Sequence, residues 1–68
     1  MKRIVKLVVF IAATPGFSDH PQVANGASDL LVAVFGNHGK HARSAVGVSS
    51  LPRGAAVEIE AVVELDVL

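Results

Sequence analysis

The apolar positions of the chain form one continuous run, one helical pattern and two alternating stretches. Residues 2–13 are rich in Val, Ile and Phe, which is typical of a strand buried on both faces. Thr14-Pro15-Gly16 then predicts a turn. Residues 57–68 alternate, which predicts a second long strand. One face of that strand carries Val57, Ile59, Ala61, Val63 and Leu65, and the other carries Glu58, Glu60, Val62, Glu64 and Asp66.

A helix is predicted between these runs. Ser18 or Asp19 is suited to cap it, and Pro21 falls in the first turn, where its missing N–H costs nothing. Gly36 fits the position just after the helix, and residues 37–40 are expected to form a loop. The apolar residues at helical spacing predict one buried face, made of Val23, Ala27, Leu30, Leu31 and Val34.

A third strand is predicted over residues 43–51, followed by a turn at Leu51-Pro52-Arg53-Gly54. The order strand–helix–strand–strand predicts an α+β fold in which one helix packs on a small three-stranded sheet. The opposite face of such a sheet is left open, which favours a partner.

The composition also favours self-association. A chain of 68 residues buries only about 60% of the surface that its unfolded form exposes, so such chains often need additional support. The absence of cysteine excludes disulfides, thiolate metal sites and cysteine nucleophiles. Because 51% of the residues are hydrophobic and only 18% are charged, a disordered tail is excluded and other copies of the chain are the expected cover.

The charges make nucleic-acid binding an unfavoured function. The formal net charge is +0, and the three Phe are the only aromatic residues apart from histidine. The charges are nevertheless segregated, because Lys2, Arg3 and Lys6 open the chain and four acidic residues close it. This segregation predicts that the two terminal strands lie side by side with complementary charges.

A secretory signal is the alternative interpretation of the basic start of the chain and the apolar run that follows it. Lys6 interrupts the run, and Thr14-Pro15-Gly16 stands where a cleavage site of small residues is needed. The run is also much shorter than the roughly 20 apolar residues of a bilayer span. We therefore expect a strand, no membrane association and a cytoplasmic location.

Three motifs with possible chemistry are better explained structurally. His20, His38 and His41 do not have the convergent spacing of a zinc site, so surface histidines are expected and neither metal nor cofactor is predicted. The adjacent side chains of Ser18-Asp19-His20 cannot converge as a catalytic triad. The segment at residues 36–40 has the wrong spacing for a phosphate-binding loop.

Arg43 and Glu58 are the candidate site residues. On the same face as Arg43 the predicted strand has only small residues, Ala45, Gly47 and Ser49, which leaves room for a bound carboxylate. Glu58 opens the next strand and is expected near Arg43 across a hairpin. Such a pair can bind a small carboxylic acid and orient a water for acid–base chemistry, or it is a structural ion pair.

Residues 41–62 resemble the carboxyl-terminal signature of the Rid (YjgF-like) family: an Ala-Arg-Ser strand, a Leu-Pro turn and a Val-Glu-Ile-Glu-Ala strand. Residues 23–31, Val-Ala-Asn-Gly-Ala-Ser-Asp-Leu-Leu, are similar to the branch that carries an endoribonuclease label. The resemblance implies a homotrimer with ligand clefts between subunits. It also implies cofactor-free hydrolysis of reactive enamines and imines, such as 2-aminoacrylate, to a keto acid and ammonia.

By this resemblance Arg43 binds the substrate carboxylate and Glu58 lies near the attacking water, while Ala45 stands where many relatives have cysteine. Family members are roughly twice this length, and no counterpart of their amino-terminal half is found here. We therefore expect residues 1–68 to form a single partial domain. The alternatives are a non-catalytic ligand-binding or interaction module, an inactive truncated fragment or, less favoured, an endoribonuclease.

Overall fold

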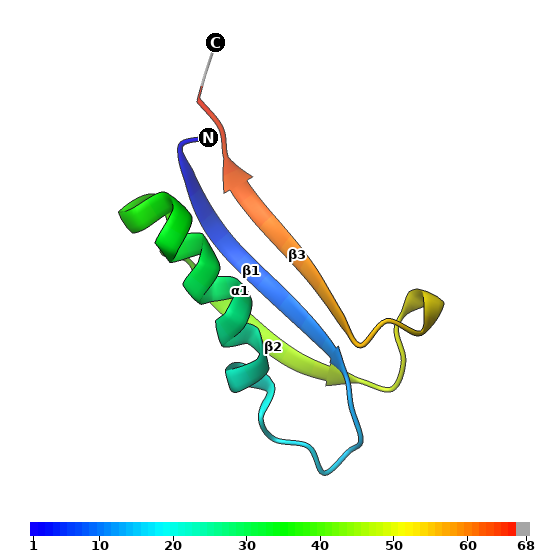
Figure 1. Ribbon diagram of the computed structural model, residues 1–68. Coiled ribbons are helices and arrows are strands. Elements are labelled where there is room, and N and C mark those ends of the chain that lie inside the picture. Colours follow the sequence, from blue (N-terminus) through cyan, green and yellow to red (C-terminus); the bar gives the residue numbers. More distant parts are fainter. Residues whose placement is uncertain (67–68) are drawn as a thin grey trace.

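The computed structural model describes residues 1–66 and confirms the order strand–helix–strand–strand (Figure 1). The strands are β1 (Arg3–Ala12), β2 (Ala42–Val48) and β3 (Val57–Glu64), and the helix is α1 (His20–Phe35). Two short 3-10 turns, η1 (Gly36–Gly39) and η2 (Pro52–Gly54), replace the predicted loop and turn. The last two residues of the predicted terminal strand lie outside the described residues.

The three strands form one mixed sheet with the order β2-β1-β3. β1 is parallel to β2 and antiparallel to β3. The expected hairpin between the last two strands is therefore wrong. The connection through α1 returns the chain parallel to β1, as crossover connections do, and the segment containing η2 then carries it to the other edge of β1. The most apolar strand, β1, thus lies between the other two strands.

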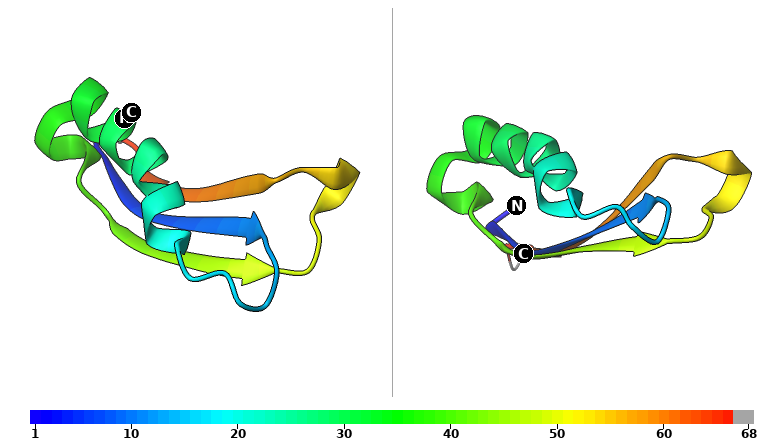
Figure 2. Two further views of the ribbon diagram at one scale, coloured as in Figure 1. Left: turned by 60° about the horizontal axis from the view of Figure 1, so that its bottom comes forward. Right: turned by 90° about the horizontal axis from the view of Figure 1, so that it is seen from below.

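The helix covers one face of the sheet over β1 and β2 (Figure 2). Leu7, Val9 and Ile11 of β1 point toward it and are buried, and Ala24 is the buried residue of α1. Val23, Leu30 and Val34, which the sequence pattern placed on the buried face, are instead exposed. The prediction of that face was right for Ala27 and Leu31, which are half-buried, and wrong for the other three residues, because the buried side of the helix is centred on Ala24.

The alternation predicted for β3 is confirmed by its register. Ile59 pairs with Val9 on the helix side of the sheet, whereas Glu58 pairs with Phe10 on the open side. The apolar side of β3 nevertheless remains uncovered, because α1 does not extend over it (Figure 2). Ile59 is 51% exposed, and Leu30 on the helix is 62% exposed. The chain therefore presents apolar surface on two elements.

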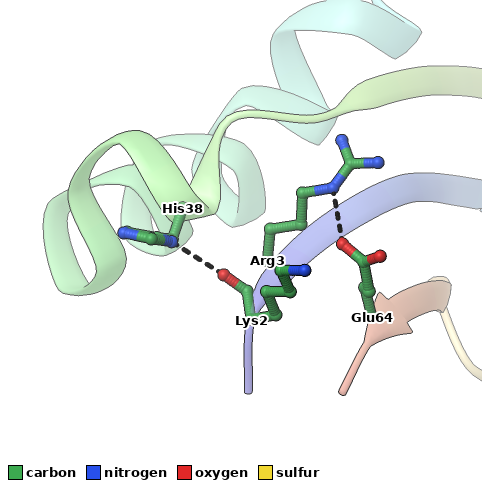
Figure 3. A network of polar contacts seen from close by, with 4 residues as sticks. All are labelled: Lys2, Arg3, His38 and Glu64. Carbon is green, nitrogen blue, oxygen red and sulfur yellow. Dashed lines mark hydrogen bonds and ion pairs between the residues drawn. The ribbon is translucent and has the colours of Figure 1, made fainter. Parts of the chain in front are cut away.

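The predicted charge complementarity of the terminal strands is confirmed (Figure 3). Arg3 Nε donates to Glu64 Oε1 at 2.9 Å, and the terminal amine of Met1 lies 3.8 Å from Asp66. The His38 ring is hydrogen-bonded to the Lys2 carbonyl oxygen at 2.7 Å. These contacts tie η1 and the end of β3 to the start of β1.

The Arg3–Glu64 pair predicts a modest acid sensitivity. The hydrogen bond from Arg3, aided by the charge of Lys2, lowers the pKa of Glu64. The stabilisation is thus present above the ordinary carboxyl range and is lost as the pH falls through the lowered pKa of the folded state. We expect the melting temperature of the native chain to exceed that of Glu64→Gln by at most a few degrees at about pH 6 and to match it at about pH 2. A difference that does not change with pH would contradict this assignment.

Candidate functional site

Arg43 lies on β2 opposite Leu7 and therefore points toward the helix side of the sheet. Its Nη1 donates to Asn25 Oδ1 at 2.8 Å and to Ser28 Oγ at 3.2 Å, both on α1. Across residues 1–66 the ion pairs are Met1–Asp66 and Arg3–Glu64, so no carboxylate of this part of the chain neutralises Arg43. Its half-buried guanidinium is held by neutral groups and keeps its capacity to bind an anion.

The small residues that follow Arg43 on β2 have a different role from the predicted one. Ala45 packs against the core around Ala24. At Gly47 an added Cβ would lie 2.6 Å from His20 Nε2. The space directly above Ala45 is therefore occupied by α1, and the His20 ring lies close to Gly47.

Glu58 lies on the opposite side of the sheet from Arg43. It is exposed and pairs with Phe10, three residues along β1 from Leu7, the partner of Arg43. Residues separated by three positions on a strand point to opposite faces, and β1 itself separates β2 from β3. The expected proximity of Arg43 and Glu58 is thus wrong within one chain, because it depended on a hairpin that does not form.

A second polar group beside Arg43 was missed by the sequence analysis. Ser28 Oγ is 3.0 Å from His41 Nε2, and His41 Nδ1 is 2.5 Å from the Gly39 carbonyl oxygen. A shallow pocket of about 260 Å³ lies over this group and is lined by Ser28, Val32, Lys40, His41 and Arg43. A helical spacing of three relates Ser28 to Asn25, and a strand spacing of two relates His41 to Arg43. These two spacings were the only sequence signal for the group. They indicate which residues share a side of the helix or of the strand, but not that the helix and the strand meet at these residues.

A larger pocket of about 350 Å³ lies where β1 and β2 end. Its lining includes Phe17, His20, Gly47 and Ser49, and the rings of Phe17 and His20 meet edge to face with centroids 5.1 Å apart. His20 begins α1, directly after the Asp19 cap position, whose side chain makes no capping hydrogen bond. The ring of His20 thus forms a wall of this pocket, a role that the sequence analysis did not assign to it.

Within residues 1–66 no three His, Asp or Glu side chains gather as metal ligands would. Over the same residues, no helix combines the length and the apolar character that a membrane crossing requires.

The comparisons with known proteins extend over nearly the whole chain. Residues 1–65 match the family described as Endoribonuclease L-PSP. The chain is 58% identical over 67 residues to Protein TCP17 of Trypanosoma cruzi, covering 97% of this chain and 42% of that protein. It matches the crystal structure of Atu1372 from Agrobacterium tumefaciens, a protein of unknown function, with a TM-score of 0.95 and 52% identity, over 97% of this chain and 42% of that one.

A third match is the crystal structure of YyfA from Yersinia pestis, a Rid-family protein of unknown function. Its TM-score is 0.58 and its identity 35%, over 88% of this chain and 42% of that one. The mixed three-stranded sheet with one covering helix is thus the fold of part of a Rid-type domain. The chain belongs to the Endoribonuclease L-PSP family, which is the Rid (YjgF-like) family, and it spans about 42% of the length of these relatives.

Proposed function

We propose that the protein binds small carboxylates through Arg43 and hydrolyses reactive enamines or imines of the 2-aminoacrylate type to a keto acid and ammonia. Family membership supports this class of reaction. The observation that carries the proposal is the state of Arg43, which is half-buried, oriented by α1 and without an acidic partner in residues 1–66. The simpler explanation is that Arg43 forms a structural ion pair. That explanation requires a carboxylate beside Arg43, and residues 1–66 place none there.

The geometry of Arg43 favours a planar anion. Both of its hydrogen bonds use Nη1, so Asn25 and Ser28 fix the plane of the guanidinium. Within residues 1–66 no hydrogen bond uses Nε or Nη2, so this edge of the guanidinium offers a carboxylate two parallel N–H donors. When the substrate carboxylate is bound at this edge, the C=N carbon attached to that carboxylate is held in a fixed position relative to Arg43.

Glu58 is the proposed general base. Its carboxylate accepts a proton from water as the water oxygen attacks the imine carbon and the nitrogen takes up a proton. The resulting carbinolamine then loses ammonia and leaves the keto acid, with no cofactor. Since Glu58 and Arg43 lie on opposite sides of the sheet, we place the site between two copies of the chain.

Self-association of this kind fits the uncovered apolar residues of the monomer. Ile59, Leu30 and Val34 are all more than half exposed, and an apolar surface on two elements is typical of an interface. We propose a homotrimer, as the family resemblance implies, with Arg43 of one copy facing Glu58 of the next.

RNA cleavage is the second candidate, because the matching family is described as an endoribonuclease. A chain with a net charge of +0 and no Trp or Tyr has little means to attract phosphates or to stack on bases. RNA cleavage that depends on Arg43 and survives stringent purification would favour this candidate over imine hydrolysis.

The test compares Glu58→Gln and Arg43→Ala with the native chain on an imine generated in situ from an amino acid, with keto acid release as the readout. We expect Glu58→Gln to lower kcat by about 10²–10⁴-fold while ligand affinity is kept, because only the base is lost. Arg43→Ala should lose carboxylate binding. Glu60→Gln and Arg53→Ala are matched controls, since both side chains are exposed, have the same charges as the site residues and are not assigned to the site.

Full turnover by Glu58→Gln would contradict the assignment of Glu58. If neither the native chain nor any variant hydrolyses the imine while Arg43 still binds carboxylates, the protein is a ligand-binding module and not a deaminase.

A further inference from the structure

The contacts between Ser28 and His41 define which atom carries each proton. The Gly39 carbonyl oxygen can only accept, so the His41 Nδ1 that lies beside it carries a hydrogen. In the neutral ring Nε2 then has a free lone pair, and the Ser28 hydroxyl, 3.0 Å away, donates to it. A hydroxyl, an imidazole base and a group that orients the base are thus arranged in sequence, as in activated serine nucleophiles.

The surroundings of Ser28 stabilise negative charge on its oxygen. Arg43 Nη1 donates to the same Oγ at 3.2 Å. When His41 withdraws the hydroxyl proton, the oxygen therefore remains hydrogen-bonded to a cation. Ser28 lies in the middle of α1 and Gly39 is buried, so both ends of this arrangement are held by regular structure.

We propose that Ser28 is a nucleophile that His41 activates as general base, and that it accepts acyl groups from small activated esters bearing a carboxylate. The pocket of about 260 Å³ over Ser28 contains two cationic side chains, Lys40 and Arg43, and no acidic one, which indicates an anionic substrate. Val32 supplies its apolar wall. This activity goes beyond the proposed imine hydrolysis, which uses no covalent intermediate.

The proposed acyl transfer uses only Ser28, His41 and water. Ser28 Oγ attacks the ester carbonyl carbon while its proton passes to His41 Nε2. The bond between the carbonyl carbon and the leaving alkoxide breaks, and the proton on His41 goes to that oxygen, which leaves as the alcohol. Water then attacks the acyl-serine by the same route and releases the carboxylic acid.

The first experiment measures acylation of the full chain by 4-nitrophenyl hydrogen succinate, with 4-nitrophenyl acetate as the uncharged comparison. We expect one acyl adduct by intact mass, located on Ser28, and faster acylation by the succinate ester. Ser28→Ala should abolish the adduct, and His41→Ala should slow acylation by about 10²–10⁴-fold. Ser44→Ala and His38→Ala are the controls, because both residues are exposed and outside the pocket.

The second experiment uses the absence of cysteine, which makes Ser28→Cys a single reporter thiol. Its alkylation by iodoacetamide is followed against pH. We expect a midpoint clearly below the ordinary thiol value of about 8.5, because His41 and Arg43 favour the thiolate, and we expect His41→Ala in the same background to raise it. Ser44→Cys gives the reference midpoint.

Circular dichroism of each variant establishes that it is folded. Equal midpoints for the two thiols, or a midpoint that His41→Ala leaves unchanged, would reduce the Ser28–His41 contact to a structural one and overturn the proposal. Acyl adducts spread over several serines at rates independent of His41 would do the same. Neither readout involves imine hydrolysis, so their failure would leave the proposed function standing.

Discussion

Replacing Leu7 by alanine is expected to unfold a large fraction of the molecules at 25 °C. Leu7 is 1% exposed, and it lies on the central strand between Arg43 of β2 and Ala61 of β3. Truncation of a buried leucine to alanine costs about 2–5 kcal/mol, because apolar contacts are lost and a cavity remains. A core in a chain of 68 residues rarely supplies more than about 3–5 kcal/mol of unfolding free energy, so this single loss removes most or all of it.

The matched control for Leu7→Ala is Ile59→Ala. Both side chains belong to the sheet and point to its helix side, but Ile59 is 51% exposed because α1 does not cover β3. In dilute solution we expect Ile59→Ala to cost less than about 1 kcal/mol, since little buried surface is lost. Urea unfolding followed by circular dichroism measures both variants. A native-like unfolding curve for Leu7→Ala would contradict the placement of the core under α1.

The helix and the three strands were predictable because each depends on the local periodicity of apolar residues. The alternation of Val57, Ile59, Ala61 and Val63 against Glu58 and Glu60 appears unchanged in the register of β3. The charged ends of the chain predicted the Arg3–Glu64 contact, because opposite charges on adjacent strands attract. Gly36 ends α1 with a positive φ of 60°, which glycine adopts without strain.

The sheet order and the packed face of α1 were not predictable in the same way. Periodicity tells which residues of a strand share a face, but it does not tell which strand lies beside it. The helix is apolar on more than one side, so Val23, Leu30 and Val34 were as plausible a core face as the stripe at Ala24. The choice between them depends on how closely α1 approaches Ala45 and Gly47 of β2.

The candidate site was also predictable only in part: a single residue could be identified from its own segment, but its partners could not. Arg43 was identified from its segment, but its partners Asn25 and Ser28 follow only from the contact between α1 and β2. Glu58 was placed near Arg43 by assuming a hairpin, and the parallel pairing of β1 with β2 removes that proximity. The pairing of Ser28 with His41 needs both the helix orientation and the path of the chain through η1.

The separation of Arg43 and Glu58 on the two faces of one sheet leads to a second large expected effect. Arg43→Ala and Glu58→Gln, each inactive in imine hydrolysis when assembled alone, should regain activity when they are unfolded together and refolded as a mixture. In a ring of three copies with one site between each adjacent pair, random assembly of equal amounts gives about one quarter of the sites an intact Arg43 from one copy and an intact Glu58 from the next. We therefore expect about one quarter of the native activity.

The control mixture combines Arg43→Ala with the double variant Arg43→Ala, Glu58→Gln, in which no site can regain Arg43. Its activity should stay at background after the same refolding, so that recovery in the first mixture cannot come from handling. If the first mixture also stays at background although mixed oligomers form, Arg43 and Glu58 do not act from neighbouring copies. Since β1 separates the two residues within each copy, the pair would then not form a joint site, and the assignment of Glu58 as the base for a substrate held by Arg43 would be wrong.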